Sequence, residues 1–199
     1  MPEQLRTVAS LIEQLQSSDR MKRLSAASQI AALEGKAKEA IPILKSWIGG
    51  EDKYSHVTAL GTIIWIDKSE ADTLIPLLIE ALQFDGLEQW EAILWIQSLG
   101  KLALPAVPAL ERLVDEGDMT ICWITSDAIF QITDNPSSVL RVGQCLLESL
   151  DEQERYVGVE HLMQLGKSVI PDLENVSVHD RSDLVRNRAL AALEEIERC

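Results

Sequence analysis

Apolar residues recur along the chain at spacings of three and four positions, which is the period of an amphipathic α-helix. The segments Leu5–Leu15 and Leu74–Leu82 show this spacing clearly. Prolines stand near the starts of several such segments, at Pro42, Pro76 and Pro108. The first turn of a helix tolerates proline, because the N–H group there has no partner within the helix. The pattern predicts an all-α chain.

The helical pattern repeats with a period of 33 residues. One aspartate stands at each interval, at Asp19, Asp52, Asp85, Asp118 and Asp151. An aliphatic residue follows 14 positions after each aspartate, at Leu33, Ile66, Leu99, Ile132 and Leu165. Two columns that keep one period over five copies indicate an internal repeat.

The residue pattern within each repeat predicts two helices joined by a turn. The aspartate follows turn residues such as Gly49 and Gly50, and its carboxylate is suited to accept hydrogen bonds from the free N–H groups that open the second helix. Several second helices are predicted to stop at glycine, at Gly35, Gly100 and Gly166. One helix pair of this length cannot bury its apolar face alone, whereas stacked pairs can. We therefore expect one α-solenoid domain over residues 1–199, with about six repeats at approximately 3–37, 38–70, 71–103, 104–135, 136–168 and 169–199.

Two segments resemble a known family. Ala26–Gly35 has the form Ala-Ala-x-x-Ile-x-x-Leu-x-Gly, and Asp183–Leu193 contains Val-Arg-x-x-Ala-x-x-Ala-Leu. Both are similar to the HEAT repeat, and more closely to the bacterial HEAT-like repeats that also occur in phycobilin lyases. The resemblance implies a right-handed superhelix that binds other proteins on the concave face formed by the second helices.

The helical wheel predicts which residues lie on that face. Counted from each aspartate, positions +5, +8, +11 and +14 or +15 are mostly apolar and are expected in the core, whereas +6, +9, +10 and +13 point away from it. In the central repeats these outward positions hold large apolar residues, which is typical of a binding patch. The predicted partner-binding residues are Trp65, Glu91, Leu94, Trp95, Ile124 and Asp127. Trp90 and Trp123, at +5, are expected in the core. The alternative is a wheel rotated by one residue, or rings buried between repeats.

The charge of the chain limits the classes of partner that we expect. There are 32 Asp and Glu against 18 Lys and Arg, a formal net charge of −14. This balance disfavours nucleic acid and anionic membrane surfaces, and the apolar runs are shorter than the roughly 20 residues of a membrane span. Residues 54–140 hold three basic and thirteen acidic residues, so a protein partner of basic character is expected. Met1–Leu5 shows no secretory signal, so we expect a cytoplasmic protein.

Candidate catalytic residues are few. The histidines are His56, His161 and His179, and the cysteines are Cys122, Cys145 and Cys199. Their spacing matches neither a metal site nor a disulfide framework. His56 is expected to make a polar contact at a helix start, and nothing in the spacing establishes a Cys145–His161 nucleophile pair.

These observations favour a non-enzymatic scaffold or adaptor that needs no cofactor and no metal. The resemblance leaves a bilin lyase, or a protein like a lyase subunit, as one alternative. An acidic inhibitor or immunity-type protein that masks a basic partner is another. A HEAT-like DNA glycosylase is disfavoured, because the acidic surroundings would repel phosphate.

Overall fold

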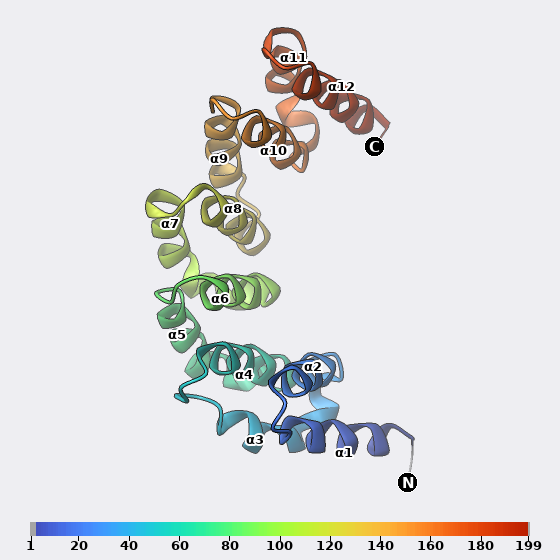
Figure 1. Cartoon of the computed structure of the whole chain (residues 1–199), viewed down its shortest axis with the longest axis vertical. Coiled ribbons are helices and arrows are strands. Elements are labelled where there is room, and N and C mark those ends of the chain that lie inside the picture. Colours follow the sequence, from blue (N-terminus) through green and yellow to red (C-terminus); the bar gives the residue numbers. More distant parts are fainter. Residues whose placement is uncertain (1–2, 199) are drawn as a thin grey trace. The chain divides into compact units, whose positions relative to one another are not determined.

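The computed structural model describes residues 3–198, with side chains from residue 8 onward; Cys199 lies outside the described residues. Every regular element in this range is helical, so the all-α prediction is confirmed. The chain divides into two compact units, residues 1–109 and 110–199, and each is described by itself (Figure 1). The single continuous domain stays a prediction.

The first unit contains three helix pairs, which follow the first three predicted repeats. Its helices are α1 (Glu3–Leu15), α2 (Arg20–Ala31), α3 (Ile41–Lys45), α4 (Lys53–Ile66), α5 (Ala71–Ala81) and α6 (Leu87–Ser98). Short 3₁₀ segments join successive pairs, at Glu34–Ala40, Lys68–Glu70 and Gly100–Ala106.

Helix α7 (Val107–Glu116) runs across the boundary between the two units. The other helices of the second unit are α8 (Met119–Thr133), α9 (Ser137–Leu147), α10 (Glu152–Met163), α11 (Ile170–His179) and α12 (Asp183–Arg198). A 3₁₀ segment, Gly166–Val169, precedes α11. Two α-helices therefore fall within each predicted repeat.

Four of the five periodic aspartates cap the helices that they precede. Asp19 accepts from the N–H of Met21 at 2.9 Å, and Asp52, Asp118 and Asp151 cap α4, α8 and α10 in the same way. The prediction is wrong for Asp85. Helix α6 begins one residue later, because Gly86 occupies the N-cap position with a φ of 66°. Glycine has no side chain that could accept a hydrogen bond from the N–H groups of the first turn.

Several of the second helices are followed by a residue whose φ is positive. Gly100 and Gly166 have φ of 54° and 60°, as the predicted glycine stops require. At the end of α2 the left-handed residue is Glu34, with a φ of 48°, and not Gly35. Positive φ strains a residue that carries a Cβ, so this position costs the fold some stability.

Helix α4 is packed between α2 and α6, and this explains why the predicted wheel is wrong there. Thr58, Gly61 and Thr62, which were expected to face outward, are buried. A Cβ added at Gly61 would lie 2.0 Å from Cδ2 of Trp95. The absence of a side chain at Gly61 therefore lets the indole of α6 lie directly against the backbone of α4.

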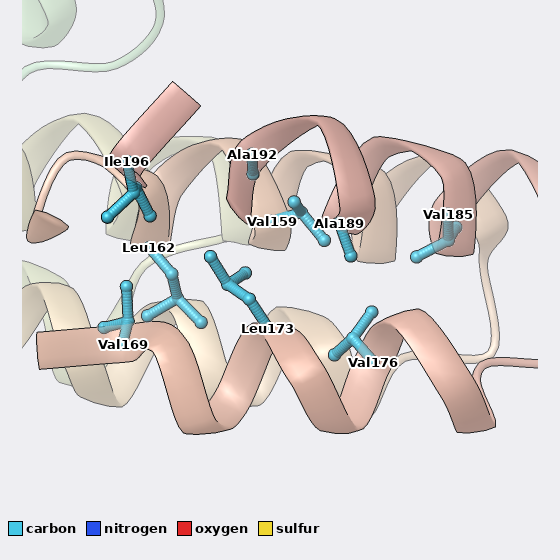
Figure 2. Packing of buried hydrophobic residues seen from close by; sticks show 9 residues of the cluster. All are labelled: Val159, Leu162, Val169, Leu173, Val176, Val185, Ala189, Ala192 and Ile196. Atoms are coloured by element: carbon cyan, nitrogen blue, oxygen red, sulfur yellow. The ribbon is translucent and has the colours of Figure 1, made fainter. Parts of the chain in front are cut away.

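In the second unit, α10, α11 and α12 enclose an apolar core (Figure 2). Its members are Val159, Leu162, Val169, Leu173, Val176, Val185, Ala189, Ala192 and Ile196. Beside it, the guanidinium of Arg155 makes two hydrogen bonds to the carboxylate of Asp180, at 2.8 and 3.2 Å. Both side chains are almost fully buried. Burial alone would raise the pKa of Asp180, but the bonds from Arg155 and from the N–H of Ser182 hold it below its ordinary value.

The tryptophans at +5 do not follow the wheel either. Trp123 is 37% exposed and Trp90 is half-buried, so the expectation that they lie in the core is wrong. In α8 the buried positions include Cys122 at +4 and Thr125 at +7. The buried face of α8 is therefore broader than the predicted one, although it leaves out Trp123.

The Gly61–Trp95 contact can be tested by a double-mutant cycle. In an open helix, Gly→Ala stabilises by up to about 1 kcal/mol, but Gly61→Ala should destabilise by about 1–3 kcal/mol because its Cβ clashes with the indole. In a Trp95→Ala background the same substitution should stabilise. Urea unfolding measures both effects.

Gly35→Ala is the matched control, since its added Cβ meets nothing nearer than 3.8 Å. Additive effects of Gly61→Ala and Trp95→Ala would contradict the proposed contact.

Candidate functional site

Four of the six predicted partner-binding residues line one pocket in the first unit. They are Trp65 on α4 and Glu91, Leu94 and Trp95 on α6. The pocket has a volume of about 420 Å³, and its other lining residues are Ala31, Ala32, Glu34 and Ser98. We call it the Trp pocket. The residues that line it come from the end of α2 and the segment after it, from α4 and from α6.

The carboxylate of Glu91 is held in place by three uncharged donors. It accepts from Nε1 of Trp95 at 2.8 Å, from Oγ1 of Thr58 at 3.2 Å and from the hydroxyl of Tyr54 at 3.0 Å. Burial, followed by the charge of Glu91 and its hydrogen bond, raises the pKa of Tyr54 to about 12. The phenol therefore stays protonated and keeps donating at neutral pH.

The indole of Trp65 is also fixed. Its Nε1 donates to Oγ of Ser98 at 3.0 Å, and Oγ of Ser98 donates to the backbone carbonyl of Trp95 at 2.7 Å. Leu94 is 39% exposed. The two indoles are half-buried and hydrogen-bonded, so they form pre-positioned apolar walls rather than mobile surface side chains.

The other two predicted residues lie in the second unit and do not line the Trp pocket. Ile124 is only 7% exposed, so the expectation that it lies on the surface is wrong. The buried face of α8 includes position +6, since Ile124, Thr125 and Ala128 are all buried. Asp127 is half-buried and belongs to a polar network.

That network links α8 to α10. Oγ of Ser126 lies 3.0 Å from Nε2 of His161, and Nδ1 of His161 lies 3.3 Å from Oδ1 of Asp127. The side-chain amide of Gln164 donates to the same oxygen at 2.6 Å. The order serine, histidine, aspartate is that of a hydrolase triad.

Burial excludes a catalytic role for this network. Ser126 is fully buried and His161 is 2% exposed, so no substrate reaches either one. Burial lowers the pKa of His161 to about 4, and the ring is neutral at pH 7. Burial raises the pKa of Asp127, although the amide of Gln164 opposes this. The three groups satisfy one another's hydrogen bonds and fasten two helices together.

The remaining candidates have structural roles. Nδ1 of His56 accepts from the N–H of Gly49 at 2.9 Å, so its predicted contact near a helix start is confirmed. Among the described residues, the ring of His161 contacts Ser126, Asp127, Gln164 and Trp123, not Cys145.

The described part of the chain shows neither a metal-binding cluster nor a membrane-spanning helix. No group of three or more His, Cys, Asp or Glu side chains there is arranged to hold a metal ion. No helix between residues 3 and 198 has the length and apolar character needed to span a membrane.

The predicted site omitted four residues that line the pocket, Ala31, Ala32, Glu34 and Ser98. It also omitted Tyr54 and Thr58, which donate to Glu91. Tyr54 stands outside the outward positions of the wheel, and Glu34 follows the end of its helix. The carboxylate of Glu91, which was predicted, is the group that connects Tyr54 to the pocket.

The fold and the pocket define the class of protein, which is an all-α protein of repeated helix pairs with a tryptophan-lined surface pocket. No family model and no curated protein matches the chain, while seven chains of solved structures do. One belongs to the complex of CpcE and CpcF of phycocyanin lyase from Nostoc sp. PCC7120. It shares 18% identity with a TM-score of 0.45, over 94% of this chain and 87% of that one. A likeness at this level supports no inference about function, and membership of the HEAT family stays a prediction.

The buried histidine predicts a pH dependence of stability. The pKa of His161 is about 4 when folded and about 6.5 when unfolded, so the unfolded state binds more protons between these values. Stability should fall by roughly 2–3 kcal/mol as the pH drops from 6.5 to 4, and His161→Gln should remove this part of the loss. Urea unfolding across this pH range measures it.

His179→Gln is the control, because His179 is exposed and this variant should follow the wild-type curve. If wild type and His161→Gln lose stability in parallel, His161 is not held neutral by burial.

Proposed function

We propose that the protein is a non-enzymatic scaffold or adaptor, and that the Trp pocket receives a projecting side chain of a partner protein. One observation carries the proposal. Two half-buried tryptophans, fixed by hydrogen bonds, share one pocket with the exposed Leu94. Tryptophan is among the residues most enriched at the energetic centres of interfaces.

The rigidity of the pocket supports binding. A side chain that is already ordered loses little entropy when a partner docks, so more of the contact energy remains as affinity. Glu91 holds Trp95 through Nε1, and Ser98 holds Trp65. The pocket walls therefore need no rearrangement before they are covered.

Charge indicates the kind of partner. Glu34 and Glu91 line the pocket, and the whole chain carries a net charge of −14. A partner with basic and apolar character is favoured both in encounter and in the docked state. An acidic inhibitor or immunity-type protein is the narrower form of the same proposal, in which the bound partner is masked.

The proposal predicts that the affinity for the partner depends on Leu94 and not on Leu87, another exposed leucine of α6. A photo-crosslinking residue at Ala32, which is exposed and lines the pocket, first identifies the partner in native lysate. With the purified partner, Leu94→Ala and Trp65→Leu should each weaken binding by roughly tenfold or more. Calorimetry measures this. The melting temperature of each variant shows whether it is folded.

Leu87→Ala and Trp47→Leu are the matched controls. Leu87 lies on the same helix and is 72% exposed, but neither Leu87 nor Trp47 lines the pocket. Equal losses for Leu87→Ala and Leu94→Ala would remove the pocket from the interface.

The bilin-lyase alternative has its own measurement. Addition of a free linear tetrapyrrole to the protein, followed by visible absorbance, distinguishes a chromophore handler from a scaffold. A saturable spectral shift that is lost in Trp65→Leu would replace the scaffold proposal.

A further inference from the structure

The Trp pocket is lined mainly by apolar surface, and, among the described residues, the charged ones that line it are all acidic. Two of its lining residues are glutamates, Glu34 and Glu91, and no lysine, arginine or histidine lines it. The donors on Glu91 are a phenol, a hydroxyl and an indole, all uncharged. A carboxylate whose hydrogen-bond donors are all neutral still carries a negative charge, which attracts a cationic ligand.

The backbone at Glu34 is a second and independent observation. Its φ of 48° lies in the left-handed region, where the residues at the same place two and four repeats later are glycines. Those are Gly100 and Gly166. Glycine adopts this conformation without strain, whereas a glutamate does not. A strained residue whose side chain lines a pocket points to a use for that side chain.

The combination of indoles and carboxylates selects one kind of cation. A guanidinium is planar and weakly hydrated, stacks on aromatic rings, and donates two parallel hydrogen bonds to a carboxylate. A lysine ammonium is compact and strongly hydrated, so it loses more on leaving water. We infer that the side chain entering the Trp pocket is an arginine of the partner protein, bound against Trp65 and Trp95, paired with Glu34 and attracted by the negative charge of Glu91. This inference rests on the proposed function.

Blocked tripeptides test the inference without the partner. The probes are acetyl-Leu-Arg-Leu-amide and the same peptide with citrulline, which is neutral and nearly isosteric, or with lysine. The five tryptophans of the chain give separate indole N–H resonances in ¹⁵N-labelled protein. The arginine peptide should shift the signals of Trp65 and Trp95 saturably, and the citrulline and lysine peptides should bind at least about tenfold more weakly.

Substitutions at Glu34 separate the charge from the backbone. Glu34→Gln should weaken the arginine peptide about tenfold while leaving the melting temperature unchanged. Glu34→Gly should weaken it equally but raise the melting temperature, since glycine relieves the strain. Asp85→Asn is the control, because Asp85 is exposed, caps no helix and does not line the pocket, and it should change neither quantity.

The outcomes distinguish this inference from the proposed function. Equal binding of the citrulline and arginine peptides, or no effect of Glu34→Gln, overturns the arginine, while the loss of partner binding in Leu94→Ala still supports the scaffold. Tighter binding of tetramethylammonium than of ethylguanidinium also overturns it, and assigns the pocket to methylated ammonium groups. If Glu34→Gly lowers the melting temperature, the argument from backbone strain is wrong.

Discussion

The first unit depends on the close contact between α4 and α6. Helix α4 packs against a second helix on each side, α2 and α6, so its residues need to fit two surfaces and not one core. Gly61 supplies the space and Trp95 fills it. The same indole then forms a wall of the Trp pocket. One pair of residues therefore contributes both to the packing of α4 on α6 and to the shape of the candidate site.

The period of 33 residues explains how much of the site was predictable. In stacked repeats, residues one period apart lie side by side. Nε1 of Trp65 bonds Ser98, and Oγ1 of Thr58 bonds Glu91, in each case across a separation of 33 positions. Reading down a column of the repeat thus finds real neighbours. It finds neither Tyr54, which reaches Glu91 over 37 positions, nor the strained backbone of Glu34, because side-chain reach and φ do not follow the period.

The errors in the wheel have a physical cause. Helical periodicity identifies a single apolar stripe, and this works for a helix with one buried face. Helix α4 is covered on both sides, so small polar residues such as Thr58 and Thr62 are buried beside the apolar ones. Ile124 is buried in α8 together with Thr125. In each helix, polar residues lie on a second buried face, so the pattern of apolar residues does not reveal that face. Asp85 differs, because a local turn residue, Gly86, displaced the cap.

Two arrangements of polar groups in this chain show that solvent access separates a structural network from a candidate binding site. His161, Ser126 and Asp127 have the order of a catalytic triad, yet they are buried and satisfy one another. Glu91 likewise accepts hydrogen bonds from three side chains, but these donors are neutral and Glu91 lines an open pocket. Hydrogen bonds fix the position of a carboxylate without cancelling its charge. The first arrangement is therefore closed to solvent, whereas the second leaves a carboxylate charge beside an open pocket, which is the basis of the proposed interaction with a cationic partner.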